Sequence, residues 1–156
     1  IALLVSVSLM FIGCKQSLVI SQVDYAQPIE TVLQPDDNGM VHDVRQGIKF
    51  NVLPLQQAET GNSSSVTITE IRMIRGKEGF YYVTAPGFKN VYVMAPGKGR
   101  LSLENKIMIS ENGIGKPAFN QREPYILLLN RETNETYTLN ANGIQQTGAK
   151  ESDKTN

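Results

Sequence analysis

Turn-forming residues interrupt this chain roughly every eight to twelve residues, and the segments between them are rich in Val, Ile, Thr and Tyr. Ile48, Phe50 and Val52 alternate with Lys49 and Asn51, which is the period of a strand with one buried face. No long stretch shows helical periodicity. The pattern therefore predicts an all-β protein, folded as an antiparallel β-sandwich rather than a barrel. An immunoglobulin-like layout is one option for such a sandwich.

Two segments ten residues apart nearly repeat each other. Residues 82–87 (Tyr-Val-Thr-Ala-Pro-Gly) and 92–97 (Tyr-Val-Met-Ala-Pro-Gly) both end in Pro-Gly. Pro presets φ and Gly accepts the left-handed position of a type II turn. We therefore expect two successive antiparallel strands, each of which runs into a Pro-Gly turn.

The clearest hairpin is predicted at residues 125–140. Its first arm, 125–130 (YILLLN), is a continuous apolar run, which indicates a central strand buried on both faces. The other expected elements are a dense turn at 34–39, a strand within 66–74, short strands at 101–103 and 106–110 around a turn at Glu104-Asn105, and a long loop at 111–123.

The first thirteen residues, IALLVSVSLMFIG, carry no charge and end at Cys14, the only cysteine. Such a run is too short to cross a bilayer as a helix and is typical of the hydrophobic region of a signal peptide. No basic segment precedes it, so we expect further residues before Ile1. Residues 11–14 (Phe-Ile-Gly-Cys) resemble the lipobox of bacterial lipoproteins, although the first position is usually leucine.

This resemblance implies cleavage before Cys14 and a lipid on its thiol, which would tether the chain to a membrane. Lys15 is not the aspartate that retains many lipoproteins in the inner membrane, so the resemblance favours the outer membrane. The alternative is a buried N-terminal strand or helix with a free cysteine. The expected organisation is a signal peptide (1–13), a lipid-anchored segment (14–29), a β-sandwich domain (30–146) and a disordered polar tail (147–156).

Charge is balanced over the whole chain but unevenly distributed along it. Residues 16–44 contain five acidic and no basic residues, whereas residues 72–106 contain seven basic and two acidic ones. These segments either face each other and solvent, or they provide a basic face for an anionic glycan, a lipid headgroup or an acidic partner. The zero net charge argues against a nucleic-acid partner.

The sequence offers few candidate catalytic groups. His42 is the only histidine, and no glycine-framed serine accompanies it, so we expect a surface histidine rather than a triad member. With Cys14 lipidated, we expect neither a zinc site nor any other metal or cofactor. Residues 36–39 (Asp-Asp-Asn-Gly) could form a calcium loop, but they lack the EF-hand spacing, which favours a plain Asx-type turn.

The chain lacks tryptophan, but Phe80, Tyr81 and Tyr82 are consecutive. Adjacent strand residues point to opposite faces, so at least one of these rings should face outward, unless all of them serve core packing. The candidate binding surface comprises Tyr81, Tyr82, Phe88, Lys89, Tyr92, Lys98 and Arg100.

Together these features predict a non-enzymatic, lipid-anchored accessory or structural subunit of an outer-membrane assembly. Its partners would be the membrane, through Cys14, and an envelope protein. The alternative is a lipoprotein that captures a glycan or another anionic molecule on the basic segment 72–106. A hydrolase that uses two carboxylates is a third possibility.

Overall fold

The computed structural model describes residues 29–148 and has the expected all-β, antiparallel, sandwich-like fold. One sheet has five strands in the order β1-β4-β5-β6-β7, and another has four in the order β11-β10-β9-β8. The first contains β1 (Thr31–Leu33), β4 (Ile71–Arg75), β5 (Tyr81–Thr84), β6 (Asn90–Gly97) and β7 (Arg100–Met108). The second contains β8 (Pro117–Arg122), β9 (Tyr125–Asn130), β10 (Glu135–Asn140) and β11 (Gly143–Gly148).

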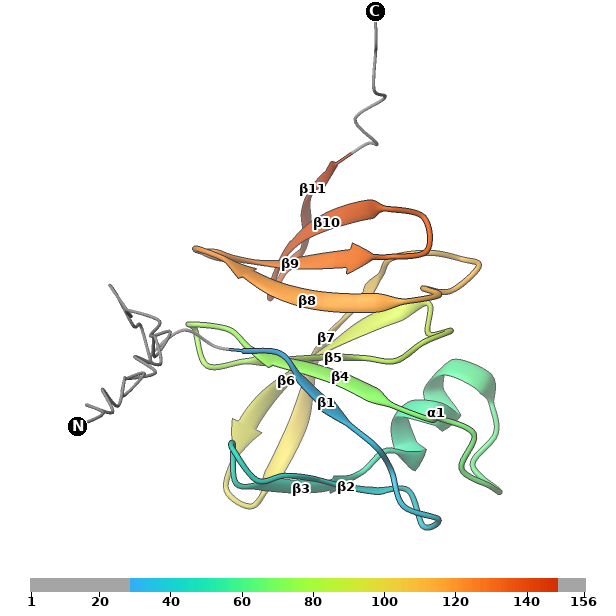
Figure 1. Ribbon diagram of the computed structural model, residues 1–156. Coiled ribbons are helices and arrows are strands. Elements are labelled where there is room, and N and C mark those ends of the chain that lie inside the picture. Colours follow the sequence, from blue (N-terminus) through green and yellow to red (C-terminus); the bar gives the residue numbers. More distant parts are fainter. Residues whose placement is uncertain (1–28, 149–156) are drawn as a thin grey trace, which may run out of the picture.

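Three layers are visible in Figure 1, with the five-stranded sheet in the middle. The four-stranded sheet covers one of its faces. The hairpin of β2 (Met40–Asp43) and β3 (Ile48–Asn51), together with helix α1 (Leu53–Thr60), covers the other. Strands β8 to β11 form a meander, as do β4 to β7. An immunoglobulin sandwich instead uses Greek-key connections, so this sandwich has a different strand order.

Each face of the five-stranded sheet has its own apolar core. Between the two large sheets, one cluster is centred on Ile74, Tyr82 and Leu128. On the opposite face, Met73, Tyr81 and Val83 pack against residues of the β2–β3 hairpin and of the segment around α1. Successive side chains of β5 point to opposite faces, and all four of its residues are buried. A strand in this position therefore has no solvent face.

Helix α1 was not expected from the sequence. It has only eight residues, begins with Pro54 in its first turn and ends at Gly61 in the left-handed conformation. Its buried Gln56 holds the loop that follows. The amide nitrogen donates to the carbonyls of Asn62 and Ser65, at 3.1 and 2.7 Å, and the amide oxygen accepts from the N–H of Thr67 at 2.8 Å and of Ile68 at 3.3 Å.

Glu30 links the two large sheets. Its carboxylate pairs with Arg72 of β4 at 3.1 Å and accepts the N–H of Phe119, in β8, at 2.8 Å. Arg72 also pairs with Glu70. The acidic N-terminal segment and the basic middle segment therefore meet at this ion pair, as one interpretation of the charge pattern predicts.

Several sequence-based boundaries are wrong. The segment expected to be a loop, 111–123, contains β8, and β7 is one continuous strand where two were expected. Pro96 and Gly97 pair with β7 inside the sheet, and the turn falls at Lys98-Gly99 instead. In the predicted strand 66–74, only Ile71 onward is a strand, and β11 continues to Gly148, past the predicted end of the domain.

Strand β9 is central in its sheet, as predicted, but it is not buried on both faces. Ile126, Leu128 and Asn130 are buried in the core, whereas Leu127 and Leu129 on the outer face are only partly covered. The predicted turn between β9 and β10 is confirmed, with Asn134 at a φ of 59°. The signal peptide, Cys14 and nearly all of the anchored segment lie outside the described residues.

Candidate binding groove

The aromatic members of the predicted binding surface are buried. Tyr81, Tyr82, Phe88 and Tyr92 belong to the two cores, and Phe80 is partly buried beside one of them, so core packing, the favoured alternative, accounts for these rings. The alternation of Tyr81 and Tyr82 is correct, because they point to opposite faces of β5. The sequence did not reveal that a second layer covers each of those faces.

The cations of the predicted surface are exposed but divided between the two ends of β6. Lys89 precedes the strand, whereas Lys98 and Arg100 flank the turn after it. Lys98 is nine residues after Lys89 along an extended chain, which corresponds to about 30 Å. Lys89 therefore does not belong to the same basic face as Lys98 and Arg100.

Tyr82 and Tyr92 have structural roles. The hydroxyl of Tyr82 donates to Glu78 at 2.6 Å, and that of Tyr92 donates to Glu59 at 2.8 Å. Burial raises the pKa of both phenols well above their ordinary value, and the neighbouring carboxylates add to this rise in pKa. Glu59 also accepts the backbone N–H of Lys89 and the side-chain amide of Asn90, which fastens α1 to the start of β6.

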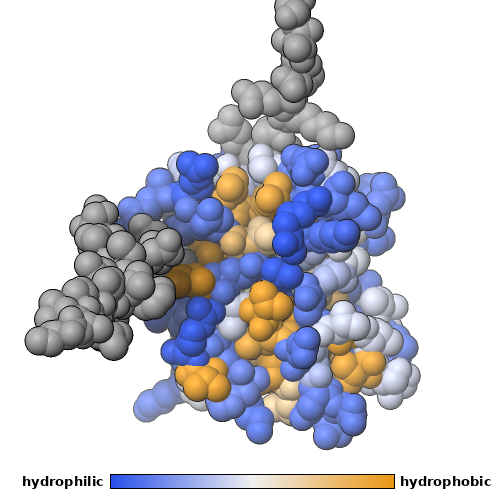
Figure 2. Space-filling view, viewed as in Figure 1, coloured by the Kyte–Doolittle hydropathy of each residue, from blue (hydrophilic) through white to orange (hydrophobic). Residues whose placement is uncertain are grey.

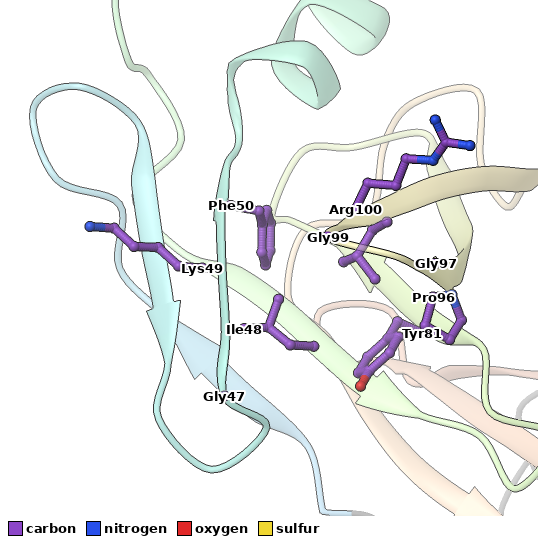
Figure 3. Close-up of a pocket in the computed structure, with 10 residues that line it drawn as sticks. Gly47, Ile48, Lys49, Phe50, Tyr81, Pro96, Gly97, Gly99 and Arg100 are labelled. Atoms are coloured by element: carbon purple, nitrogen blue, oxygen red, sulfur yellow. The ribbon is translucent and has the colours of Figure 1, made fainter.

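Tyr81 lies instead at a cavity of about 440 Å³ between the β2–β3 hairpin and the β6–β7 turn. In Figure 3, Ile48 and Phe50 project from β3 toward the side of the cavity formed by Pro96 and Tyr81. Lys49 and Arg100 also line it, but their charged ends point away from its centre. Of the predicted surface, only Tyr81 and Arg100 belong to this cavity.

A second, smaller cavity of about 160 Å³ shares Phe50 and Leu101 with the first. Its other lining residues are Asn51, Pro54, Leu55, Val83 and Met94. We call the two cavities together the hairpin groove. Its walls come from residues 47–55 and 94–101, with Tyr81 and Val83 of β5 as the floor. Because these segments are distant in sequence, no local motif indicates the groove.

The outer face of the four-stranded sheet is the second surface of interest. Leu127 and Tyr125 of β9 and Thr136 and Thr138 of β10 line a shallow depression there, of about 580 Å³. Leu129 continues the same face of β9, because every second residue of a strand shares a face. Figure 2 shows apolar side chains at the surface over this sheet, and again lower, near β1 and the β2–β3 hairpin.

The structure also bears on His42 and on residues 36–39, the sequence's candidates for catalysis and calcium binding. His42 is exposed on β2, as predicted. Residues 36–39 form an Asx-type turn, in which the Asp36 carboxylate accepts the N–H groups of Asn38 and Met40, both at 2.9 Å. Within residues 29–148, no three His, Cys, Asp or Glu side chains gather as a metal site would require. No helix in that part of the chain is long and apolar enough to span a bilayer.

Comparison with known proteins gives no relative: no protein family matches the sequence, and neither a curated protein nor a solved structure matches it.

Proposed function

We propose that this chain is a lipid-anchored, non-enzymatic accessory subunit of a bacterial outer-membrane assembly, and that it docks on its partner through the outer face of the four-stranded sheet. The anchor in this proposal is Cys14, at the end of the lipobox-like segment. Ile29 is fifteen residues after Cys14, and an extended segment of that length spans about 50 Å at most. A domain on such a tether can reach a membrane protein beside its anchor.

The uncovered outer face of the four-stranded sheet carries the proposal. Among residues 29–148, apolar cores cover both faces of the five-stranded sheet, whereas they cover only the inner face of the four-stranded sheet. Along the middle of its outer face run Tyr125, Leu127 and Leu129, and the facing side chains of β10 are Thr138 and Thr136. Arg122 and Glu123, of opposite charge, also line the depression on this face. A partly apolar sheet face without an excess of either charge suits a protein surface better than it suits a glycan or a polyanion.

The alternative function, capture of an anion by the basic segment 72–106, has less support. Arg72 is already paired with Glu30 and Glu70, and Lys77 is paired with Glu123. Lys89 lies at the opposite end of β6 from Lys98 and Arg100. Arg75, which lies over the Tyr81 ring, and Arg100, which lines the same cavity as Tyr81, do approach one place, but the segment as a whole does not form one basic face.

A pull-down from the native envelope in mild detergent tests the docking proposal. Tagged wild-type protein is compared with Leu127→Asp and Thr138→Arg, which place charge on the outer face. The matched control is Leu103→Asp, because Leu103 is 56% exposed on β7 of the other sheet. Thermal unfolding of each variant confirms that it is folded.

We expect a stoichiometric membrane protein with the wild type and with Leu103→Asp, and its loss with both outer-face variants. Recovery of the wild-type protein without a partner would overturn the proposal. Retention of the partner by both folded outer-face variants would overturn the assignment of the docking face.

A further inference from the structure

The hydroxyl of Tyr81 distinguishes it from the other buried tyrosines. Tyr82, Tyr92 and Tyr137 each donate a hydrogen bond to a carboxylate, of Glu78, Glu59 and Glu135 respectively. Tyr81 has only 5% of its surface exposed, but its hydroxyl is not one of the buried side-chain atoms that lack a partner, and no described residue hydrogen bonds to it. Because Tyr81 lines the hairpin groove, we infer that its hydroxyl opens into that groove.

The groove is built to hold an apolar body. Ile48, Phe50 and Leu101 line the larger cavity, and Phe50 and Leu101 continue into the smaller one beside Leu55 and Met94. The volume of the larger cavity, about 440 Å³, falls in the range of sites for small molecules, and the smaller cavity adds about 160 Å³ beside it. An aliphatic chain that enters beside Tyr81 would therefore find apolar walls along its length.

The charged residues that line the larger cavity of the groove are all basic. The lining of the larger cavity includes Lys49 and Arg100 but no acidic residue. Arg75 lies over the Tyr81 ring, with its guanidinium carbon 5.5 Å from the ring centroid. Arg100 is exposed, so its guanidinium can rotate over the mouth of the groove. An anion at the Tyr81 hydroxyl would therefore lie in a positive potential and could accept a hydrogen bond from that hydroxyl.

We propose that the hairpin groove binds a small amphiphile with an unbranched apolar body and a single carboxylate. The carboxylate accepts the hydroxyl of Tyr81 and is neutralised by Arg100, while the apolar body lies along Phe50 and Leu101 toward Met94. The ligand supplies the carboxylate that Glu78, Glu59 and Glu135 supply to the other three tyrosines. This site is on the other side of the molecule's central sheet from the proposed docking face, and it does not depend on that proposal.

Titration calorimetry with decanoate tests the site, using purified protein that carries Cys14→Ser so that no attached lipid competes. Decanol, which has the same chain without a charge, is the matched ligand control. Tyr81→Phe removes one oxygen that no described residue bonds, so this variant should unfold at the wild-type temperature. Arg100→Gln removes the charge at the mouth. The protein controls are Tyr125→Phe and Arg131→Gln, at exposed positions outside the groove.

We expect one saturable decanoate site, with decanol and Tyr81→Phe each weakening binding about tenfold and Arg100→Gln weakening it several-fold. Both protein controls should bind like the wild type. Equal binding of decanol and decanoate, or wild-type affinity in folded Tyr81→Phe, would overturn the proposal. So would tighter binding of an apolar peptide with a free C-terminal carboxylate, because the occupant would then be a polypeptide.

Discussion

Replacing Gln56 by leucine should destabilise the protein far more than the same change at the next residue. Gln56 is fully buried, and its amide makes four hydrogen bonds to backbone groups of residues 62–68. Gln57 is exposed and makes one such bond, to the carbonyl of Gly61 at 3.1 Å. Leucine and glutamine have similar helix propensities and sizes, so the hydrogen bonds are the main difference between the two sites.

The size of the effect follows from these bonds. Each hydrogen bond contributes about 0.5–1.5 kcal/mol net, and four of them give about 2–6 kcal/mol. Some of the freed loop groups can reach water after the substitution, so we expect the lower part of this range, about 2–4 kcal/mol. For Gln57→Leu we expect a change within about 1 kcal/mol. A loss of 2–4 kcal/mol is a large share of the stability of a small domain.

Urea denaturation of the wild type and both variants measures this difference. Hydrogen exchange at the amide of Thr67 gives a local readout, because that N–H donates to the Gln56 side chain at 2.8 Å. Its exchange should accelerate in Gln56→Leu and not in Gln57→Leu. If the two variants lose equal stability, or if Thr67 stays protected in Gln56→Leu, then Gln56 does not hold the loop as described.

Three further predictions concern other contacts. Glu30→Ala removes the link to both Arg72 and Phe119 and should cost about 2 kcal/mol in urea denaturation, whereas exposed Glu104→Ala should cost almost nothing. Gly113→Ala would place a Cβ 2.6 Å from the carbonyl oxygen of Gly87, at a φ of +84°, and should lower the free energy of unfolding by about 3 kcal/mol. Gly99→Ala is the control, because Gly99 has a φ of +67° but no atom within 4 Å of the added Cβ, and it should cost about 1 kcal/mol. Finally, the pKa values of Tyr82, Tyr92 and Tyr137 are raised in the folded state. The stability that these phenols contribute is therefore complete below pH 10 and should fall above it, by up to about 1.4 kcal/mol per pH unit for each tyrosine. Tyr82→Phe should flatten this alkaline decline, and a decline that is unchanged in that variant would refute the assignment.

The regular strands could be predicted because their sequence signals are local. The alternation at Ile48 and Phe50 identifies β3, and the turn at 131–134 identifies the β9–β10 hairpin. Strand β8 gives no such signal: it begins with Pro117, is half polar, and is a strand because it pairs with β9. Helix α1 is likewise too short to show a period, and its fixed position depends on contacts made by Gln56 and Glu59.

The binding surfaces were harder to predict because they depend on which faces a second layer covers. The sequence correctly places Tyr81 and Tyr82 on opposite faces of one strand, but both faces prove to be covered. Conversely, the apolar run of β9 predicts burial on both faces, but the described residues bury only one of these faces and leave the other partly covered. The hairpin groove arises only when the β2–β3 hairpin packs beside the β6–β7 turn.

The most direct test of the central claim, that a lipid on Cys14 anchors this β domain to the envelope, is mass spectrometry of the mature N-terminus. The protein is purified from the membrane fraction of its native organism. We predict an N-terminal peptide that begins at Cys14 and carries the added mass of acyl chains. Cys14→Ser should lose that mass and leave the membrane fraction. An unmodified Cys14, or a chain that continues uncleaved through residues 1–13, would contradict the account.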